Sequence, residues 1–149
     1  MTNAVQPMPP VEGARPSAYI PLRMPSTLLE RLARGPLLAD GAMGTQLYQR
    51  GIGFDQSFDG LNLTRATVVE SVHRDYLAAG AELIETNTFG CNEVRLAPHE
   101  LADKVRLIAR QGVKVARAAR AIVGVNAFVA GSIGPLGRPL EPFGNIPVA

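Results

Sequence analysis

The stretch TRATVVESVHRDYLAAGAELIETNTFGCN (residues 64–92) reads as a helix, a strand and a polar loop in succession. Apolar residues recur every three or four positions in its first part, which predicts an amphipathic helix over about 65–79, with Thr64 as N-cap and Gly80 as C-cap. Residues 83–86 then predict a short buried strand that opens into a polar loop. The helix residues expected to share a buried face are Val68, Val69, Val72, Tyr76 and Leu77.

The same order of strand, polar loop and helix recurs on both sides of this stretch. Upstream, residues 37–40 form an apolar run that ends in an acid, which predicts a first parallel strand. Downstream, the pattern predicts a long helix over 100–121 and a third strand over 128–133, followed by a loop rich in Gly and Pro. Strands at intervals of about 45 residues leave room for right-handed βαβ crossovers. The predicted fold class is therefore α/β with a parallel sheet.

The predicted helix over 100–121 is strongly two-sided. Gly112 lies within its apolar stripe, and we expect it to allow close packing against the strand layer. The stripe consists of Leu101, Val105, Ile108, Gly112, Val115, Ala119 and Ile122. The basic residues between them are expected to face solvent: Lys104, Arg106, Arg110, Lys114, Arg117 and Arg120.

Length and composition are those of a single soluble globular domain. The chain has 149 residues, of which 46% are hydrophobic and 19% are charged, so it can bury a core. Its net charge is only +2 and no Lys/Arg cluster is interleaved with aromatic residues, so we expect no nucleic-acid partner. No apolar run approaches the roughly 18 residues needed to cross a bilayer, so we expect no membrane partner. Cys91 is the only cysteine, which excludes an internal disulfide and fits a reducing, cytoplasmic location.

The beginning of the chain differs from the rest. Residues 1–24 are rich in Pro and show no periodicity, which predicts a flexible tail. Thr27 and Glu30 have the spacing of a capping box, so we expect order to begin there with a short helix that ends at Gly35 and Pro36.

The loops after the three predicted strands favour a barrel over an open, doubly wound sheet. Each is polar or rich in glycine, as expected where barrel enzymes collect their substrate-binding residues. A complete TIM barrel, (βα)8, has eight strands in about 250 residues, so three strands make about three βα units. We therefore expect residues 25–149 to be the N-terminal portion of a barrel domain. Its unpaired sheet edge predicts self-association.

Asp40, Gly41 and Ala42 make the most informative local pattern. An acid at a strand end, followed by glycine, allows backbone amides to approach a ligand closely. The carboxylate could hold an ammonium group while nearby N–H groups meet a carboxylate, which together would recognise an amino acid. The alternative is a plain turn in which Asp40 caps the helix after it.

Polar residues also follow the second and third strands. Four polar residues in a row, at 85–88, stand where an apolar strand ends, and we expect several of them to point into the mouth of the barrel. After Glu85, the residues Thr86, Asn87 and Thr88 offer neutral donors and acceptors, and Ser132 lies at the end of the third strand. In the alternative reading, the side chains at 86–88 satisfy their own loop, and Ser132 is small only to allow the turn at 134–135.

The residues able to bind a soft metal do not form a recognisable site. No two of them share a zinc-like spacing, so we expect no metal site within this chain: they are His73, Cys91 and His99. His73 lies beside Arg74 and Asp75, which predicts a surface position, and Cys91 is interpreted as a small loop filler. No catalytic residue can be assigned.

Three stretches resemble the homocysteine S-methyltransferase family, which includes the homocysteine-binding module of methionine synthase, betaine and S-methylmethionine enzymes, and fusions with methylenetetrahydrofolate reductase. They are LLADGAMGTQLYQRG (37–51), FDGLNLTRATVVESVHRDYLAAGAELIETNTFGCNEVRL (58–96) and VAGSIGPLG (129–137). The resemblance implies a (βα)8 barrel in which three cysteines hold Zn²⁺ and the metal activates the homocysteine thiol as a thiolate, which then takes a methyl group. In this family the zinc cysteines lie in later strands, beyond Ala149, and Cys91 is not one of them. We therefore expect this chain alone to lack zinc and to be inactive.

The resemblance also implies roles for residues in this sequence. Asp40 would hold the amino group of homocysteine, and the amides of Gly41 and Ala42 would meet its carboxylate. The residues implied to line the same pocket are Thr86, Asn87 and Thr88.

Other interpretations stay open at this point. A non-catalytic half-barrel binding module would need a complementary chain, and a nucleotide-binding α/β protein would need a phosphate-loop pattern that this sequence lacks. The sequence does not show whether the methyl donor is a folate, a cobalamin, betaine or S-methylmethionine. Nor does it show whether a reductase or cobalamin domain follows.

Overall fold

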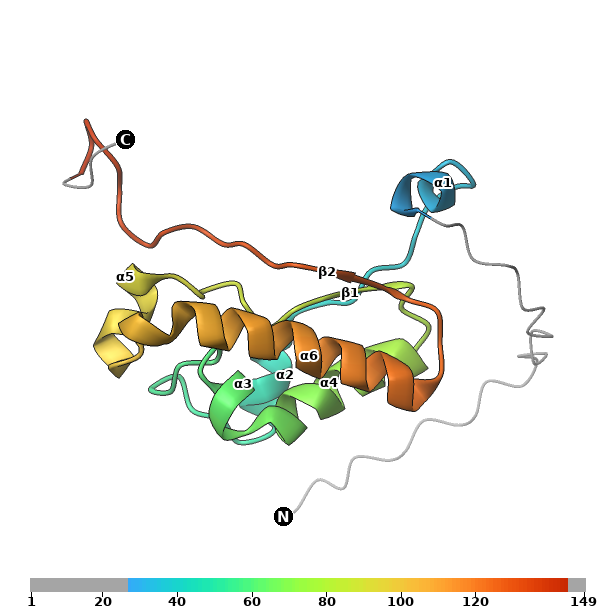
Figure 1. The fold of residues 1–149 in the computed structure, drawn as a ribbon, viewed down its shortest axis with the longest axis horizontal. Helices are drawn as coiled ribbons and strands as arrows, with labels where there is room; N and C mark the ends of the chain where they lie inside the picture. The colour runs from blue at the N-terminus through green and yellow to red at the C-terminus, as the bar shows by residue number, and fades with distance from the viewer. Residues whose placement is uncertain (1–26, 145–149) are drawn as a thin grey trace, which may run out of the picture.

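The computed structural model describes residues 27–144, and the prediction for residues 1–24 lies outside this range. Its sheet consists of two parallel strands, β1 (Leu83–Glu85) and β2 (Phe128–Ala130), with Ile84 paired to Val129 (Figure 1). The helices are α1 (Leu28–Leu32), α2 (Met43–Gln49), α3 (Leu61–Thr64), α4 (Ala66–Ala78), α5 (Glu93–Leu96) and α6 (Val105–Val123), with 3-10 turns η1 (Ala97–His99) and η2 (Ala102–Lys104).

The predicted first strand is present only as a single parallel bridge. Ala39 pairs with Leu83, and the N–H of Asp40 donates to the carbonyl of Leu83 at 2.9 Å. The spatial order is therefore the segment around Ala39, then β1, then β2, all parallel. The prediction of a full strand over 37–40 is wrong in extent. Leu38 is 57% exposed, so the apolar run that suggested a buried strand is only partly buried here.

The helices α2, α3, α4 and α6 lie together on one side of the strands (Figure 1). Two hydrophobic clusters join them. The first cluster consists of Leu47, Ile52, Leu61, Val69, Val72 and Val115, and the second, beneath the sheet, of Leu77, Ala81, Ile84, Ala116, Ala119 and Ala127. The mixed α/β class with parallel strands is confirmed in the part of the chain described here.

Helix α4 begins one residue later than predicted. Its N-cap is Arg65, so the prediction of Thr64 as N-cap is wrong: Thr64 ends α3, and its hydroxyl donates to the carbonyl of Gly60 at 3.4 Å. The C-cap is Ala79, and Gly80 follows it at a φ of +103°, a conformation that favours glycine. On the predicted face, three residues are buried and two are partly buried: Val69, Val72, Leu77, Val68 and Tyr76.

Helix α6 starts at Val105 rather than near 100, because Glu100 adopts a left-handed φ of +57° between two short 3-10 turns. Ile122 is 55% exposed, so its assignment to the buried stripe is wrong. Gly112 is buried, but it approaches α3 and the loop after β1 rather than the strands. Five of the predicted solvent-facing basic residues are exposed, whereas Arg120 is half-buried and donates to the carbonyl of Ala127 at 3.0 Å.

His73 is completely buried, so its predicted surface position is wrong. Val69 and Leu77 lie four residues before and after it on α4, and both are buried, so the helical repeat places His73 on the same face. The exposed neighbours Arg74 and Asp75 concealed this periodicity. Burial lowers the pKa of His73 to about 4, and neither ring nitrogen has a hydrogen-bond partner among the described residues.

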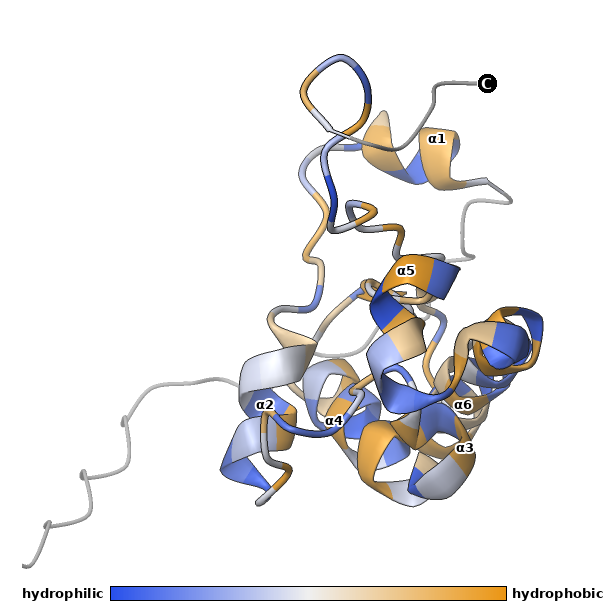
Figure 2. Ribbon diagram, turned by 90° about the vertical axis from the view of Figure 1, so that its left-hand side faces the viewer, coloured by the Kyte–Doolittle hydropathy of each residue, from blue (hydrophilic) through white to orange (hydrophobic). Residues whose placement is uncertain are grey.

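Helix α1 stands apart from the other helices and carries exposed leucines (Figure 2). The predicted capping box is confirmed: Glu30 N–H donates to the Thr27 hydroxyl at 3.2 Å, and Thr27 N–H donates to the Glu30 carboxylate at 3.3 Å. Arg31 ties the helix to the start of β1, donating to both carboxylate oxygens of Glu82 at 2.7 Å. It also donates to the carbonyls of Gly35 and Pro36. The hydrogen bonds that Arg31 donates to the Glu82 carboxylate lower the pKa of Glu82.

Substitution of Arg31 by lysine is expected to loosen α1 without unfolding the rest of the chain. Lysine keeps the positive charge but cannot form the two parallel bonds of the guanidinium group, nor reach both carbonyls at once. Amide hydrogen exchange in residues 28–32 should therefore quicken several-fold, while exchange in α4 stays unchanged. Equal exchange rates in α1 before and after the substitution would show that the ion pair does not hold the helix.

Candidate functional site

A cavity of about 640 Å³ lies at the carboxyl ends of the three parallel segments. Six of the seven predicted site residues line it: Asp40, Gly41, Ala42, Thr86, Asn87 and Ser132. Thr88 lines a smaller neighbouring cavity of about 120 Å³ instead, which Ser132 also borders. Residues from three well-separated parts of the sequence are thus brought to one edge of the sheet.

Asp40 is held in place by the neighbouring strand. Its two carboxylate oxygens accept hydrogen bonds from the N–H of Glu85 at 3.0 and 3.2 Å. Partial burial raises the pKa of Asp40 to about 6, and the nearby negative charge of Glu85 adds to the rise. The N-cap of α2 is Ala42 and has no side-chain hydrogen bond, so Asp40 does not cap this helix. The alternative reading of Asp40 as a helix cap is therefore wrong.

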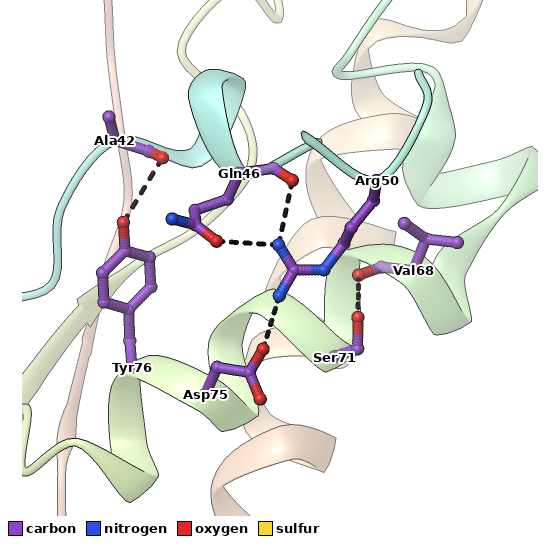
Figure 3. Close-up of polar contacts among 7 residues, drawn as sticks. All are labelled: Ala42, Gln46, Arg50, Val68, Ser71, Asp75 and Tyr76. Carbon is purple, nitrogen blue, oxygen red and sulfur yellow. Dashed lines mark hydrogen bonds and ion pairs between the residues drawn. The ribbon is translucent and has the colours of Figure 1, made fainter. Parts of the chain in front are cut away.

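The turn at Gly41 and Ala42 rests on helix α4. The Tyr76 hydroxyl donates to the carbonyl of Ala42 at 3.4 Å (Figure 3). A Cβ atom at position 41 would lie 3.1 Å from the same hydroxyl, so glycine lets the backbone pass close to the ring. Both residues of the turn are exposed. The turn is thus held by Tyr76 on one side and remains accessible to solvent.

Helix α2 is fastened to α4 by a second contact beside this turn (Figure 3). The Arg50 guanidinium donates to the carbonyl and the side-chain oxygen of Gln46, at 2.9 and 2.8 Å, and forms an ion pair with Asp75 of α4. Arg50 thus holds the C-terminal end of α2 on α4, while Tyr76 of α4 contacts the turn at the other end of α2.

The polar residues at 86–88 largely satisfy one another and the adjacent strand. The hydroxyls of Thr86 and Thr88 are 2.7 Å apart, and the Thr88 hydroxyl also donates to the carbonyl of Ser132 at 2.8 Å. The N–H of Ser132 donates to the Thr86 hydroxyl at 3.1 Å, and its own hydroxyl donates to the Glu85 carboxylate at 2.8 Å. The bond between the two threonines fits the alternative interpretation, in which these residues satisfy their own loop, whereas the bonds to Ser132 tie the loop to the segment after β2.

Glu85 is a cavity residue that the sequence argument did not select. It is exposed, lines the cavity beside Asp40 and accepts the Ser132 hydrogen bond. In the register it lies opposite Ala130, at the C-terminal end of β1. Its place in the run of four polar residues at 85–88, where the strand ends, was the signal that pointed to it.

Several other residues that line the cavity were not predicted from the sequence. They include Phe54, Phe58, Asp59, Arg95 and His99. Asp59 accepts a hydrogen bond from the N–H of Gly90 at 2.9 Å, and burial raises the pKa of its carboxyl group. These residues precede α3 or follow β1, and no local pattern in the sequence links the two segments.

Metal ligands are few in the part of the chain that the structure covers. No group of three His, Cys, Asp or Glu side chains there could hold a metal ion. Cys91 is half-buried, its thiol donates to the carbonyl of Val105 at 3.4 Å, and burial raises its pKa. Within residues 27–144 we also find no helix with the length and apolar character to span a bilayer.

Comparison with known proteins gives a consistent result. Residues 37–148 match the family model described as homocysteine S-methyltransferase. Over 127 residues, the chain is 41% identical to methionine synthase of Mycobacterium leprae and 39% identical to that of Mycobacterium tuberculosis, covering 79% of this chain in both cases. It spans only 10% and 11% of the lengths of these two proteins.

The fold also matches solved structures. The crystal structure of the homocysteine methyltransferase MmuM from Escherichia coli in its metallated form superposes with a TM-score of 0.63 at 28% identity, over 72% of this chain and 41% of MmuM. The oxidized form gives a TM-score of 0.62 at 30% identity, over 73% and 41%. The described fold therefore corresponds to part of that enzyme.

Proposed function

Since this chain belongs to the homocysteine S-methyltransferase family, we propose that it forms the homocysteine-binding side of an enzyme that transfers a methyl group to the homocysteine thiolate. The observation that carries the proposal is Asp40, a half-buried carboxylate at a strand end, facing a cavity beside an exposed glycine turn. We place the strands within a (βα)8 barrel, as the N-terminal portion of its sheet.

In this proposal the cavity recognises both charged ends of an amino acid. The carboxylate of Asp40 pairs with the ammonium group, which relieves its repulsion with Glu85. The N–H groups of Gly41 and Ala42 donate to the substrate carboxylate from the start of α2, where no side chain occupies the cap. The sulfur end is then directed into the rest of the cavity.

The remaining predicted residues have supporting roles. Thr86, Asn87 and Ser132 form the wall beside the substrate. Thr88 holds the third strand end through the carbonyl of Ser132, rather than facing the same cavity. We therefore assign Thr88 to the support of the site.

The zinc ion that the family resemblance implies does not fit the residues at hand. The chain has one cysteine, and its described residues offer no group of three metal ligands. The three-cysteine site would have to come from a further part of the domain, so the proposed role of this chain is to bind and orient homocysteine. Its methyl donor would be one of the four classes named above.

A calorimetric titration of the 149-residue chain with reduced L-homocysteine tests this proposal. We expect one binding site, no stoichiometric zinc and no methyl transfer. N-acetylhomocysteine is the matched control, because it lacks the ammonium charge that Asp40 is proposed to hold. Equal affinity for the two compounds, or no binding of homocysteine, would contradict the proposal. Stoichiometric zinc together with methyl transfer would contradict the expectation that this chain alone is inactive.

The alternative of a half-barrel module that pairs with a complementary chain has one observation in its favour. Leu38 is 57% exposed and Ile133 is 93% exposed, next to the strands. Apolar side chains placed like this are normally covered by a further layer. Mixing this chain with a polypeptide that contains the later strands of the family domain distinguishes the two interpretations: stable pairing with restored methyl transfer would support the module.

A further inference from the structure

Asn62 is a fully buried polar residue next to the cavity, in the short helix α3. Its side-chain amide donates to the carbonyl of Asn87 at 2.7 Å and to the carbonyl of Ile108 in α6 at 3.4 Å. Its side-chain oxygen accepts a bond from the Asn87 amide at 3.2 Å. One side chain therefore joins α3, α6 and the loop after β1.

Asn87 completes this arrangement from the cavity side. Its side-chain amide also donates to the carbonyl of Phe58 at 2.7 Å, so both of its N–H groups are bonded within the protein. Phe58 and Asn87 both line the large cavity. The position of the cavity wall thus depends on a pair of asparagines that bond each other in both directions.

Gly112 of α6 makes room for the pair. A Cβ atom at this position would lie 2.8 Å from the Thr88 Cγ2 atom and 2.9 Å from the Asn62 side-chain nitrogen, closer than real contacts allow. Because glycine has no side chain, α6 can press directly against both residues. Gly112 and Asn62 therefore act on the same loop from two different helices.

We propose that Asn62, supported by Gly112, is a positioning residue that fixes the loop 86–88 in the geometry that binds homocysteine. The proposal rests on the proposed function of the cavity. A buried amide with both its donors and its acceptor engaged has one favourable orientation, and the loop inherits that orientation through Asn87. The binding wall is then already in place before substrate arrives, which reduces the entropy cost of binding.

Loss of the Asn62 side-chain bonds should leave the carbonyl of Asn87 without its partner and remove one of the two bonds that hold the Asn87 side-chain amide. For Asn62→Leu, which keeps a similar volume, we expect about tenfold weaker homocysteine binding. For Gly112→Ala we expect a loss in the same direction, because the added methyl group displaces Thr88 and Asn62. Both variants should also speed amide exchange at Thr86 and Thr88, whose N–H groups donate to Ala130 and Thr86.

The matched control is Val69→Ala in α4. Val69 is equally buried but belongs to a hydrophobic cluster that includes no residue of the loop. This variant should lower the melting temperature while leaving homocysteine affinity and loop exchange unchanged, provided that binding is measured well below the transition. A role for Asn62 in stability alone would make Asn62→Leu behave like Val69→Ala.

The experiment combines calorimetric titration of the 149-residue chain with homocysteine and hydrogen exchange of the unliganded chain. Weaker binding and faster loop exchange in both Asn62→Leu and Gly112→Ala would support the proposal. Unchanged affinity in Asn62→Leu would overturn it. If the unaltered chain fails to bind homocysteine, the proposed function fails. Exchange then decides the positioning role separately: unchanged exchange at residues 86–88 in both variants would overturn that role as well.

Discussion

Replacement of Asp40 by asparagine is expected to weaken homocysteine binding by about 30-fold at pH 7.5, equivalent to about 2 kcal/mol. The change removes the charge that pairs with the substrate ammonium but keeps an oxygen that can accept the hydrogen bond from the N–H of Glu85. We choose the lower part of the range for broken charge pairs because Asp40 is only half-buried. Calorimetric titration gives both affinities directly.

The pH dependence of binding provides a second readout for the same change. The pKa of Asp40 in the free chain is about 6, so the carboxylate becomes protonated as the pH falls through this value. Binding of an ammonium group requires the ionised form, so affinity should fall by about tenfold between pH 7.5 and pH 5. Asp40→Asn should show no such fall over this range.

Asp103→Asn is the matched control for these measurements. Asp103 is exposed, lies in η2 and does not line the cavity. Its replacement alters the net charge of the chain by the same amount, and we expect it to leave affinity and pH dependence unchanged. Similar losses in the Asp40 and Asp103 variants would show that Asp40 acts only through overall charge, and would refute its assigned role.

Replacement of His73 by leucine is expected to stabilise the chain, and increasingly so at low pH. The imidazole is fully buried without a hydrogen-bond partner among the described residues, and burial lowers its pKa to about 4 from an ordinary value of 6.5. The unfolded chain therefore binds a proton more readily than the folded chain between pH 6.5 and pH 4. Stability that is present above pH 6.5 is lost as the pH falls through this window.

The size of this effect follows from the two pKa values. Between pH 7.5 and pH 5, His73 should remove about 2 kcal/mol from the free energy of unfolding. The difference between His73→Leu and the unaltered chain should grow by that amount, because contributions from other groups, including Asp40, are common to both. Urea denaturation at the two pH values measures it. Parallel pH profiles for the two proteins would show that His73 is not buried in neutral form.

The sequence predicted those parts of the structure that depend on local pattern. The helix at α4, the strands β1 and β2 and the capping box at Thr27 follow from periodicity and from residue types that favour helix ends. The cluster of Asp40, Thr86 and Ser132 at one sheet edge follows from the rule that parallel strands end on the same side.

The parts that failed depend on contacts between distant segments. The run at 37–40 is apolar enough for a strand, but only Ala39 has a bridge partner among the described residues. His73 was assigned from its charged neighbours, although its surroundings are set by the packing of α4. Asn62 was missed because its bonds reach residues 25 and 46 positions away, which no local window contains. Glu85 was left out of the candidate site residues, and its bond to Ser132 spans 47 positions.

Position 40 should tolerate few substitutions, because the Asp40 carboxylate also forms part of the contact between the first parallel segment and β1. Beyond the single bridge at Ala39, the first parallel segment meets β1 through the Asp40 side chain, which bonds to the backbone of Glu85 much as a main-chain carbonyl would. In the proposed function, the same atoms also receive the substrate. One residue then serves both the fold and ligand recognition. Even Asp40→Glu, which keeps the negative charge, would have to re-form the hydrogen bonds to the N–H of Glu85 with a longer side chain.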